Sequence, residues 1–200
     1  TEIANFTVTQ TGGSTTVSEA GTTDSFSVVL NAQPASNVVL TVTSGDTGEA
    51  TVSPAALTFT PQNWNTLQTV TVTGVDDDLV DGTQTTAVTI SVDDGNSDNA
   101  FDDVLDQAVS VTTTNIDVAG FTITPSGGNT SVTEAGTTDT FTVVLNAQPN
   151  SDVVLTVTSG DTSEATVNPA TLTFTPQNWN SAQTVTVTGA DDDLIESTQT

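Results

Sequence analysis

The chain has 200 residues, of which 25 are Asp or Glu and none is Lys, Arg or His, so its formal charge is −25. No side chain can neutralise phosphates, which excludes nucleic acid as a direct partner and argues against docking on anionic lipid. The absence of Cys excludes disulfides and structural zinc, and no apolar run approaches the ~20 residues that span a bilayer. Thr, Val and Ser dominate, and 34% hydrophobic residues are too many for a disordered chain. The composition predicts an extracellular, acidic, all-β protein with no membrane insertion.

Short segments that alternate apolar and polar residues follow one another along the first half of the chain. In chain order they predict strands near Phe6–Thr9, Thr15–Val17, Ser25–Leu30, Val38–Thr43, Ala50–Val52, Leu57–Thr60, Thr69–Thr73, Thr86–Val92 and Ala108–Thr113. Gly, Pro, Asn and Asp cluster between these segments, as at Pro61–Asn65, and no stretch has a useful helical period. Seven to nine short strands in about 110 residues are typical of an Ig-like β-sandwich with Greek-key connections.

The chain repeats itself at an offset of 115 residues. Residues 5–85 align with residues 120–200 without a gap, and 61 of the 81 positions are identical. Copies this similar indicate tandem modules, so we expect one β-sandwich repeat over 1–117 and a second over 118–200. The second copy stops at the equivalent of Thr85 and lacks counterparts of the last two predicted strands. Either the chain is part of a longer array, or another subunit supplies those strands.

An acidic run occurs in both copies, at Asp76–Asp81 and at Asp191–Glu196. Four carboxylates within six residues repel one another unless a cation lies among them. Since no side chain is cationic, the cation is either solvent counterions or a bound metal, and ligands that are all oxygen favour Ca²⁺. The acids Glu19 and Asp117, with Asp46 and Glu49 of the turn 44–49, lie in loops that meet at one end of the sandwich if successive strands alternate in direction. The alternative is that these acids are solvated surface charge.

Four segments of the first copy resemble a Calx-beta domain, the Ca²⁺-binding Ig-like module of sodium–calcium exchangers and of large bacterial surface proteins. They are Val17–Gly21, Ser44–Thr47, Asp76–Asp81 and the closing Asp117. The stretch Leu57–Gly74 is similar to the variety found in bacterial repeat-in-toxin-type adhesins. The resemblance covers the first copy and the available part of the second, and it implies an Ig-like sandwich that binds Ca²⁺.

The resemblance also implies which residues bind the metal. In the first copy the ligands would be Glu19, Asp46, Asp76, Asp77, Asp81 and Asp117, with the backbone carbonyl of Leu79. In the second copy they would be Glu134, Asp161, Asp191, Asp192 and Glu196, with the backbone carbonyl of Leu194. The family usually ends a module with several consecutive acids, whereas only Asp117 follows Asn115 and Ile116 here. That difference predicts one or two ions in each module rather than several.

Three other features have ordinary interpretations. The segment Asp93–Asp103 is acidic but lacks the spacing and the terminal Glu of an EF-hand, so we expect a hairpin loop. Trp64 and Trp179 could stack on sugars, but their position at the start of a strand favours packing. The glycosylation sequons at Asn5 and Asn129 are weak signals in a chain rich in Thr and Ser.

The residue types that the chain contains also limit the functions that it could have. The chain has no His, Cys, Lys or Tyr, so the usual catalytic bases and nucleophiles are missing and we expect no enzyme. The leading hypothesis is a Ca²⁺-stabilised tandem repeat of a cell-surface adhesin stalk or an extracellular filament, with neighbouring repeats or filament subunits as its partners. One alternative is a Ca²⁺-dependent carbohydrate-binding adhesive module that recognises a glycan or surface receptor. A third possibility is polymerisation by strand donation.

Overall fold

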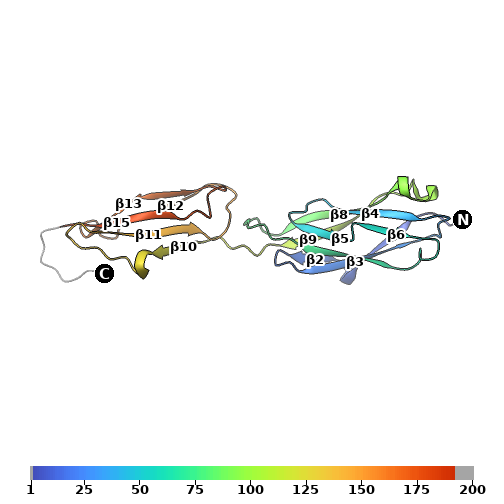
Figure 1. The fold of residues 1–200 in the computed structure, drawn as a ribbon, viewed down its shortest axis with the longest axis horizontal. Helices are drawn as coiled ribbons and strands as arrows, with labels where there is room; N and C mark the ends of the chain where they lie inside the picture. The colour runs from blue at the N-terminus through green and yellow to red at the C-terminus, as the bar shows by residue number, and fades with distance from the viewer. Residues whose placement is uncertain (1, 192–200) are drawn as a thin grey trace. The chain divides into compact units, whose positions relative to one another are not determined.

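A computed structural model describes residues 2–191 as an all-β protein, which confirms the predicted fold class (Figure 1). The chain forms two compact units. Unit 1 comprises Thr1–Asp77 and Asp81–Ile116, and unit 2 comprises Asp78–Val80 and Asp117–Thr200. Within the described range the only helical elements are single 3₁₀ turns, and none of them is long or apolar enough to cross a membrane.

Unit 1 contains all nine strands that the alternating pattern predicts, and each lies within two residues of its expected bounds. One sheet has the order β1-β3-β7-β5, formed by Phe6–Gln10, Thr23–Leu30, Gln68–Gly74 and Ala50–Ser53. The other has the order β2-β9-β8-β4-β6, formed by Thr15–Ser18, Gln107–Thr114, Gln84–Val92, Val38–Ser44 and Ala56–Phe59. Paired neighbours are antiparallel except β2 and β9, which are parallel.

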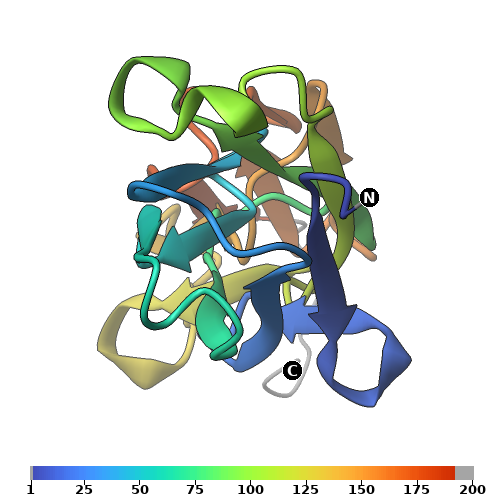
Figure 2. The same ribbon diagram turned by 90° about the vertical axis from the view of Figure 1, so that its right-hand side faces the viewer.

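The two sheets of unit 1 enclose one buried apolar cluster. Every second residue of each strand points into it, so that Phe26 of β3, Phe59 of β6 and Ile90 of β8 are fully buried. Alternation of this kind is what a sheet with one covered face requires. The turns η2 (Asp94–Asn96) and η3 (Asn99–Phe101) lie at the margin of the sandwich, as the green segment in Figure 2 shows.

Unit 2 repeats only part of this architecture. One sheet has the order β10-β11-β15-β13, formed by Phe121–Pro125, Thr138–Leu145, Gln183–Gly189 and Ala165–Asn168. The other contains only β12 (Val153–Thr156) and β14 (Thr171–Phe174). Each of these strands corresponds to a strand of unit 1, but residues 2–191 contain no second copy of β8 or β9. The buried cluster is accordingly small, with Val143, Leu145, Leu172, Phe174 and Val185 at its centre.

Candidate metal centre

The acidic run of the first copy leaves the end of β7 beside two other loops. Gly74, the last residue of β7, lies so close to the backbone of Ser18 that an added Cβ would overlap the Ser18 carbonyl. The next amide, of Val75, donates to the carbonyl oxygen of Glu49 at 2.9 Å. Because β7 contacts the backbone on both sides, the acids that follow it lie near Glu19 and near Glu49.

The first acidic group consists of Glu49, Asp77 and Asp81. One carboxylate oxygen from each residue lies within 4.8 Å of the others. Glu49 precedes β5 and is only 8% exposed. Its Oε2 atom is buried and has no hydrogen-bond partner among the described residues. A buried carboxylate oxygen without a partner is costly, so this atom needs a donor or a cation.

Hydrogen bonds hold Asp81 in place within this group. Its Oδ1 atom accepts from the side-chain amide of Asn115 at 3.1 Å, and its Oδ2 atom accepts from that of Gln84 at 2.7 Å. Gln84 begins β8, while Asn115 follows directly after β9. The start of β8 and the residue that follows its neighbour β9 therefore fix the orientation of this carboxylate.

Burial, together with the negative charges of this group, raises the pKa of Glu49 above its ordinary value. Burial is the largest cause, and the nearby charges of Asp81, Asp77, Glu19 and Asp46 follow in that order. All these effects disfavour the ionised form. Two carboxylates about 5 Å apart repel each other by on the order of 1–4 kcal/mol, depending on the local dielectric. The chain offers no Lys, Arg or His to offset that repulsion.

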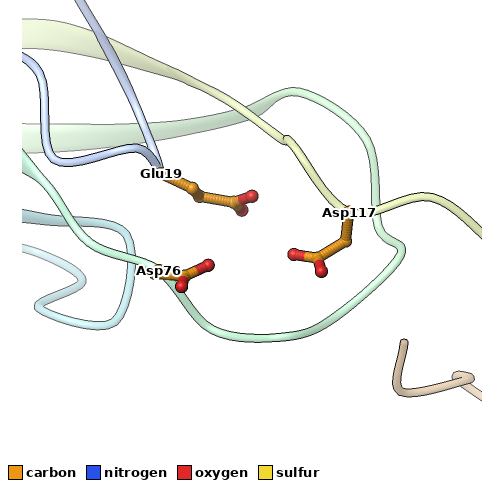
Figure 3. A group of neighbouring side chains, drawn as sticks. All are labelled: Glu19, Asp76 and Asp117. Carbon is orange, nitrogen blue, oxygen red and sulfur yellow. The ribbon is translucent and has the colours of Figure 1, made fainter. Parts of the chain in front are cut away.

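The second acidic group consists of Glu19, Asp76 and Asp117, whose carboxylates point toward one another (Figure 3). Again one oxygen from each lies within 4.8 Å of the others. Glu19 is 3% exposed, and its backbone amide donates to the carbonyl of Thr114 at 3.2 Å. Its Oε2 atom accepts from the amide of Ile116 at 2.8 Å. The segment that leaves β9 therefore positions both Glu19 and the adjoining Asp117.

Five of the acids expected in the first copy thus fall into two groups, and one does not. Asp46 belongs to neither group: its Oδ1 accepts from the amide of Gly48 at 2.9 Å, and its carbonyl accepts from Ala50 at 3.1 Å. It shapes the turn that presents Glu49. The sequence places Glu49 in the same turn and at the same end of the sandwich, but the resemblance implies Asp46 as the ligand from this turn and does not include Glu49.

Leu79, the expected carbonyl ligand, lies in the segment Asp78–Val80. Within unit 2 this segment forms a short bridge with Gln148, whose amide donates to the carbonyl of Asp78 at 2.8 Å. The amide of Val80 in turn donates to the carbonyl of Gln148 at 3.3 Å. A metal-binding role for Leu79 stays a prediction.

The second copy does not reproduce the groups within residues 2–191. Glu134 and Asp161 are exposed, and so is Asp191. Asp161 is held in its own turn by Ser163, whose hydroxyl and amide lower the pKa of its carboxyl. The other expected ligands, Asp192, Leu194 and Glu196, lie outside the described residues.

The two groups have the chemistry of a hard-cation site. Their side chains offer only oxygen ligands, and one oxygen is buried without a partner among the described residues. Ca²⁺ takes six to eight oxygen ligands in flexible geometry, and carboxylates bind it through one or both oxygens. Three carboxylates in each group, supplemented by backbone carbonyls and water, fit that requirement. The residues present could therefore hold Ca²⁺.

Comparisons with known proteins give similarity of fold only. No family model matches the chain, and no curated protein does. Among solved structures, the apo form of the Calx CBD1 domain is 15% identical with a TM-score of 0.41, covering 58% of this chain and 100% of that one. The CBD12 structure from CALX1.2 is 14% identical with a TM-score of 0.38, covering 94% and 76%. SSP-19, an MSP-domain-like protein of Caenorhabditis elegans, is 17% identical with a TM-score of 0.34, covering 51% and 92%. Likeness at this level carries no functional argument.

Proposed function

We propose that unit 1 is a Ca²⁺-stabilised structural module, and that the chain is a tandem-repeat segment of an extracellular surface protein such as an adhesin stalk or a filament. The observation that supports the proposal best is the buried Oε2 atom of Glu49, which lies beside Asp77 and Asp81 in a chain without cationic side chains. Bound Ca²⁺ would replace carboxylate repulsion with attraction. At a free ion concentration 100 times Kd, it would stabilise the folded unit by about 2.7 kcal/mol.

A structural role accounts for other features of the chain as well. Near-identical tandem copies suit a spacer, because a reaction seldom needs one site many times in a row. The absence of Lys and Arg leaves trypsin-like proteases no cleavage site. Trp64 and Trp179 each pack against the core of their unit, which favours a structural role over sugar stacking for these two rings.

Thermal unfolding of the full chain tests this proposal. We expect millimolar CaCl₂ to raise the midpoint of unit 1 by several degrees relative to EDTA. The double variant Asp77→Asn/Asp81→Asn should lose most of that gain. The matched control Asp93→Asn/Asp94→Asn changes the same charge in an acidic loop outside both groups and should keep the gain. Identical midpoints with CaCl₂ and EDTA, or equal gains in both double variants, would show that the acidic groups are only solvated charge.

A further inference from the structure

The second strand of unit 1 pairs directly with the last one. The register of β2 and β9 begins with Thr15 opposite Val111 and ends with Ser18 opposite Thr114, which makes four residue pairs. Among the strands of the described residues these are the only parallel neighbours, since every other pair is antiparallel. Parallel neighbours run in the same direction, so the chain enters β2 at one end of the pair and leaves β9 at the opposite end. Tension along the chain therefore pulls the two strands past each other, and all four residue pairs resist it together.

The β2–β9 pair is shielded from water. Thr15 and Val17 of β2 are at most 2% exposed, and so are Val111 and Thr113 of β9. A hydrogen bond in such surroundings is stronger than in water, and a backbone group that loses its partner there is costly. Slippage of β2 along β9 would break bonds of this kind before water could replace them.

Further hydrogen bonds extend the pairing beyond the end of β2. The amide of Glu19 donates to the carbonyl of Thr114 at 3.2 Å, and the hydroxyl of Thr114 donates to the carbonyl of Val17 at 3.4 Å. The Oε2 atom of Glu19 accepts from the amide of Ile116 at 2.8 Å. A hydrogen bond to a carboxylate is roughly twice as strong as one between neutral groups. Glu19 therefore joins the end of β2 to the segment that leaves β9.

The second acidic group lies at the same end of the pair (Figure 3). Glu19 follows β2 directly, and Asp117 is the third residue after β9. One carboxylate oxygen of each lies within 4.8 Å of the other and of an oxygen of Asp76. The smallest displacement of β2 that keeps its buried face inward is two residues, or about 6.6 Å. Carboxylates that share an ion would have to release it before β2 could move that far.

We infer that the β2–β9 pair is the element of unit 1 that resists tension along the chain, and that Glu19 holds the end of this pair, through its bond to the Ile116 amide and as a ligand of an ion. The role of the strand pair follows from its direction and burial. The contribution of the ion rests on the proposed calcium site and gives the group of Glu19, Asp76 and Asp117 a mechanical role. Under tension the height of the barrier to unfolding, rather than the equilibrium stability, decides how long a folded unit lasts.

Single-molecule pulling of the full chain tests the dependence on direction. The chain has no cysteine of its own, so two introduced cysteines define where the force acts. In Ser14→Cys/Val118→Cys the tethers lie before β2 and after β9, so tension shears the pair. In Ser14→Cys/Leu105→Cys each tether precedes its strand, so β2 opens one residue pair at a time. All three positions are exposed. At one loading rate in EDTA, we expect the first arrangement to require about twice the force of the second, or more, because four pairs must break together.

Calcium should act mainly on the sheared pair. Millimolar CaCl₂ should raise the rupture force of the first arrangement and leave that of the second nearly unchanged, because β2 then opens from Thr15, at the end away from Glu19. Glu19→Gln keeps an oxygen that can accept from the Ile116 amide but removes the charge, so it should lose the increment that calcium gives in the first arrangement. Asp94→Asn removes the same charge outside both acidic groups and should keep that increment.

The outcomes separate this inference from the calcium site. Equal rupture forces in the two arrangements would overturn the role of the β2–β9 pair, even if the chain binds Ca²⁺. Equal calcium increments in Glu19→Gln and Asp94→Asn would overturn the role of Glu19. A direction dependence that persists in EDTA, while calorimetry detects no binding of Ca²⁺, would support the strand pair as the resisting element and would refute the calcium site instead.

Discussion

Glu49 is the acid of unit 1 for which both burial and neighbouring negative charges disfavour ionisation. Its carboxylate is buried beside two other acids, and burial is the main reason why its pKa is raised. A raised pKa means that the folded state holds this proton more tightly than the unfolded state does. Without metal, the resulting stability is present below the ordinary pKa of Glu49 and is lost as the pH rises through the folded value. When Glu49 is ionised, the apo unit therefore carries a buried charge that destabilises it and that a bound cation would neutralise.

The variant Glu49→Gln should consequently have opposite effects in the two conditions. In EDTA at pH 7 it should stabilise unit 1 by on the order of 1 kcal/mol, because an amide of the same shape removes the buried charge. In CaCl₂ it should destabilise the unit by a similar amount, because a ligand is lost. Thermal unfolding in both buffers measures this, with the exposed Asp94→Asn as control. A loss of stability in EDTA would contradict the account.

Asp98 has a different role, because its carboxylate accepts hydrogen bonds from backbone amides and so holds two loop segments together. It accepts hydrogen bonds from the amides of Ala35 at 2.6 Å, Ser36 at 2.9 Å and Ala100 at 3.0 Å. The pKa of Asp98 is lowered, chiefly by the Ala100 amide and then by that of Ser36. These hydrogen bonds join the loop after β8 to the segment that leads into β4. The ionised carboxylate of Asp98 therefore stabilises this loop at the margin of the sandwich.

The sign of the Asp98 effect is opposite to that of Glu49. Its contribution should be fully present above the unfolded pKa of 3.8 and should disappear as the pH falls through the lower folded value. We expect Asp98→Ala to lower the unfolding midpoint at pH 7 in EDTA, and to converge with the wild type as the pH falls below that range. Unfolding midpoints measured across this pH range check the prediction. Curves that stay parallel would show that the carboxylate charge is irrelevant.

Among the secondary-structure elements, an identical short segment has different backbone structures in the two copies. Val-Thr-Ser is strand at 42–44 and irregular at 157–159, and β2 has no counterpart at Thr130–Thr133. In unit 1 both segments pair with β8 or β9. Alternation is a local property, so the sequence could predict all nine strands of unit 1. Pairing is not local, so the persistence of each strand in the second copy depends on neighbours that the local pattern does not encode.

The same limit applies to the candidate site. The sequence predicted five of its six acids through a motif resemblance. It placed Glu49 in a loop at the same end of the sandwich but could not predict that Glu49 belongs to the site, because the burial of that side chain follows from the packing of three loops. It also could not predict the role of Asp46, whose carboxylate bonds within its own turn. The close approach of Gly74 to Ser18, which brings these loops together, has no signal in the sequence beyond the glycine itself.

The substitution Gly74→Ala tests that approach. A methyl group there would overlap the Ser18 backbone, so we expect a loss of about 1–3 kcal/mol of stability. Because the displaced loop carries Asp76 and Asp77, Ca²⁺ affinity should fall as well. The control Gly95→Ala meets its nearest neighbour at 3.6 Å and should change stability by less than about 0.5 kcal/mol. Denaturant unfolding and calcium titration of both variants provide the comparison.

For the whole molecule, the dominant fact is 25 acids without one basic side chain. Self-repulsion of this size destabilises a compact state and is screened by salt. We expect the apo chain to unfold at a higher temperature in 0.5 M NaCl than in 0.02 M NaCl. Millimolar CaCl₂ should exceed the effect of NaCl at matched ionic strength, because a bound ion acts at the acidic groups themselves. If CaCl₂ and NaCl raised the unfolding temperature equally at equal ionic strength, Ca²⁺ would act only by screening charge and not by binding.

The most direct test of the central claim is a calorimetric titration of the full chain with CaCl₂ at fixed ionic strength. We predict saturable binding of at least one ion, which is lost or weakened at least tenfold in Asp77→Asn/Asp81→Asn and retained in Asp93→Asn/Asp94→Asn. MgCl₂ should bind more weakly, since Mg²⁺ requires a smaller and more regular shell of ligands. The absence of saturable heat from the wild-type chain, or identical isotherms for the two double variants, would contradict the assignment of these acidic groups as a calcium site.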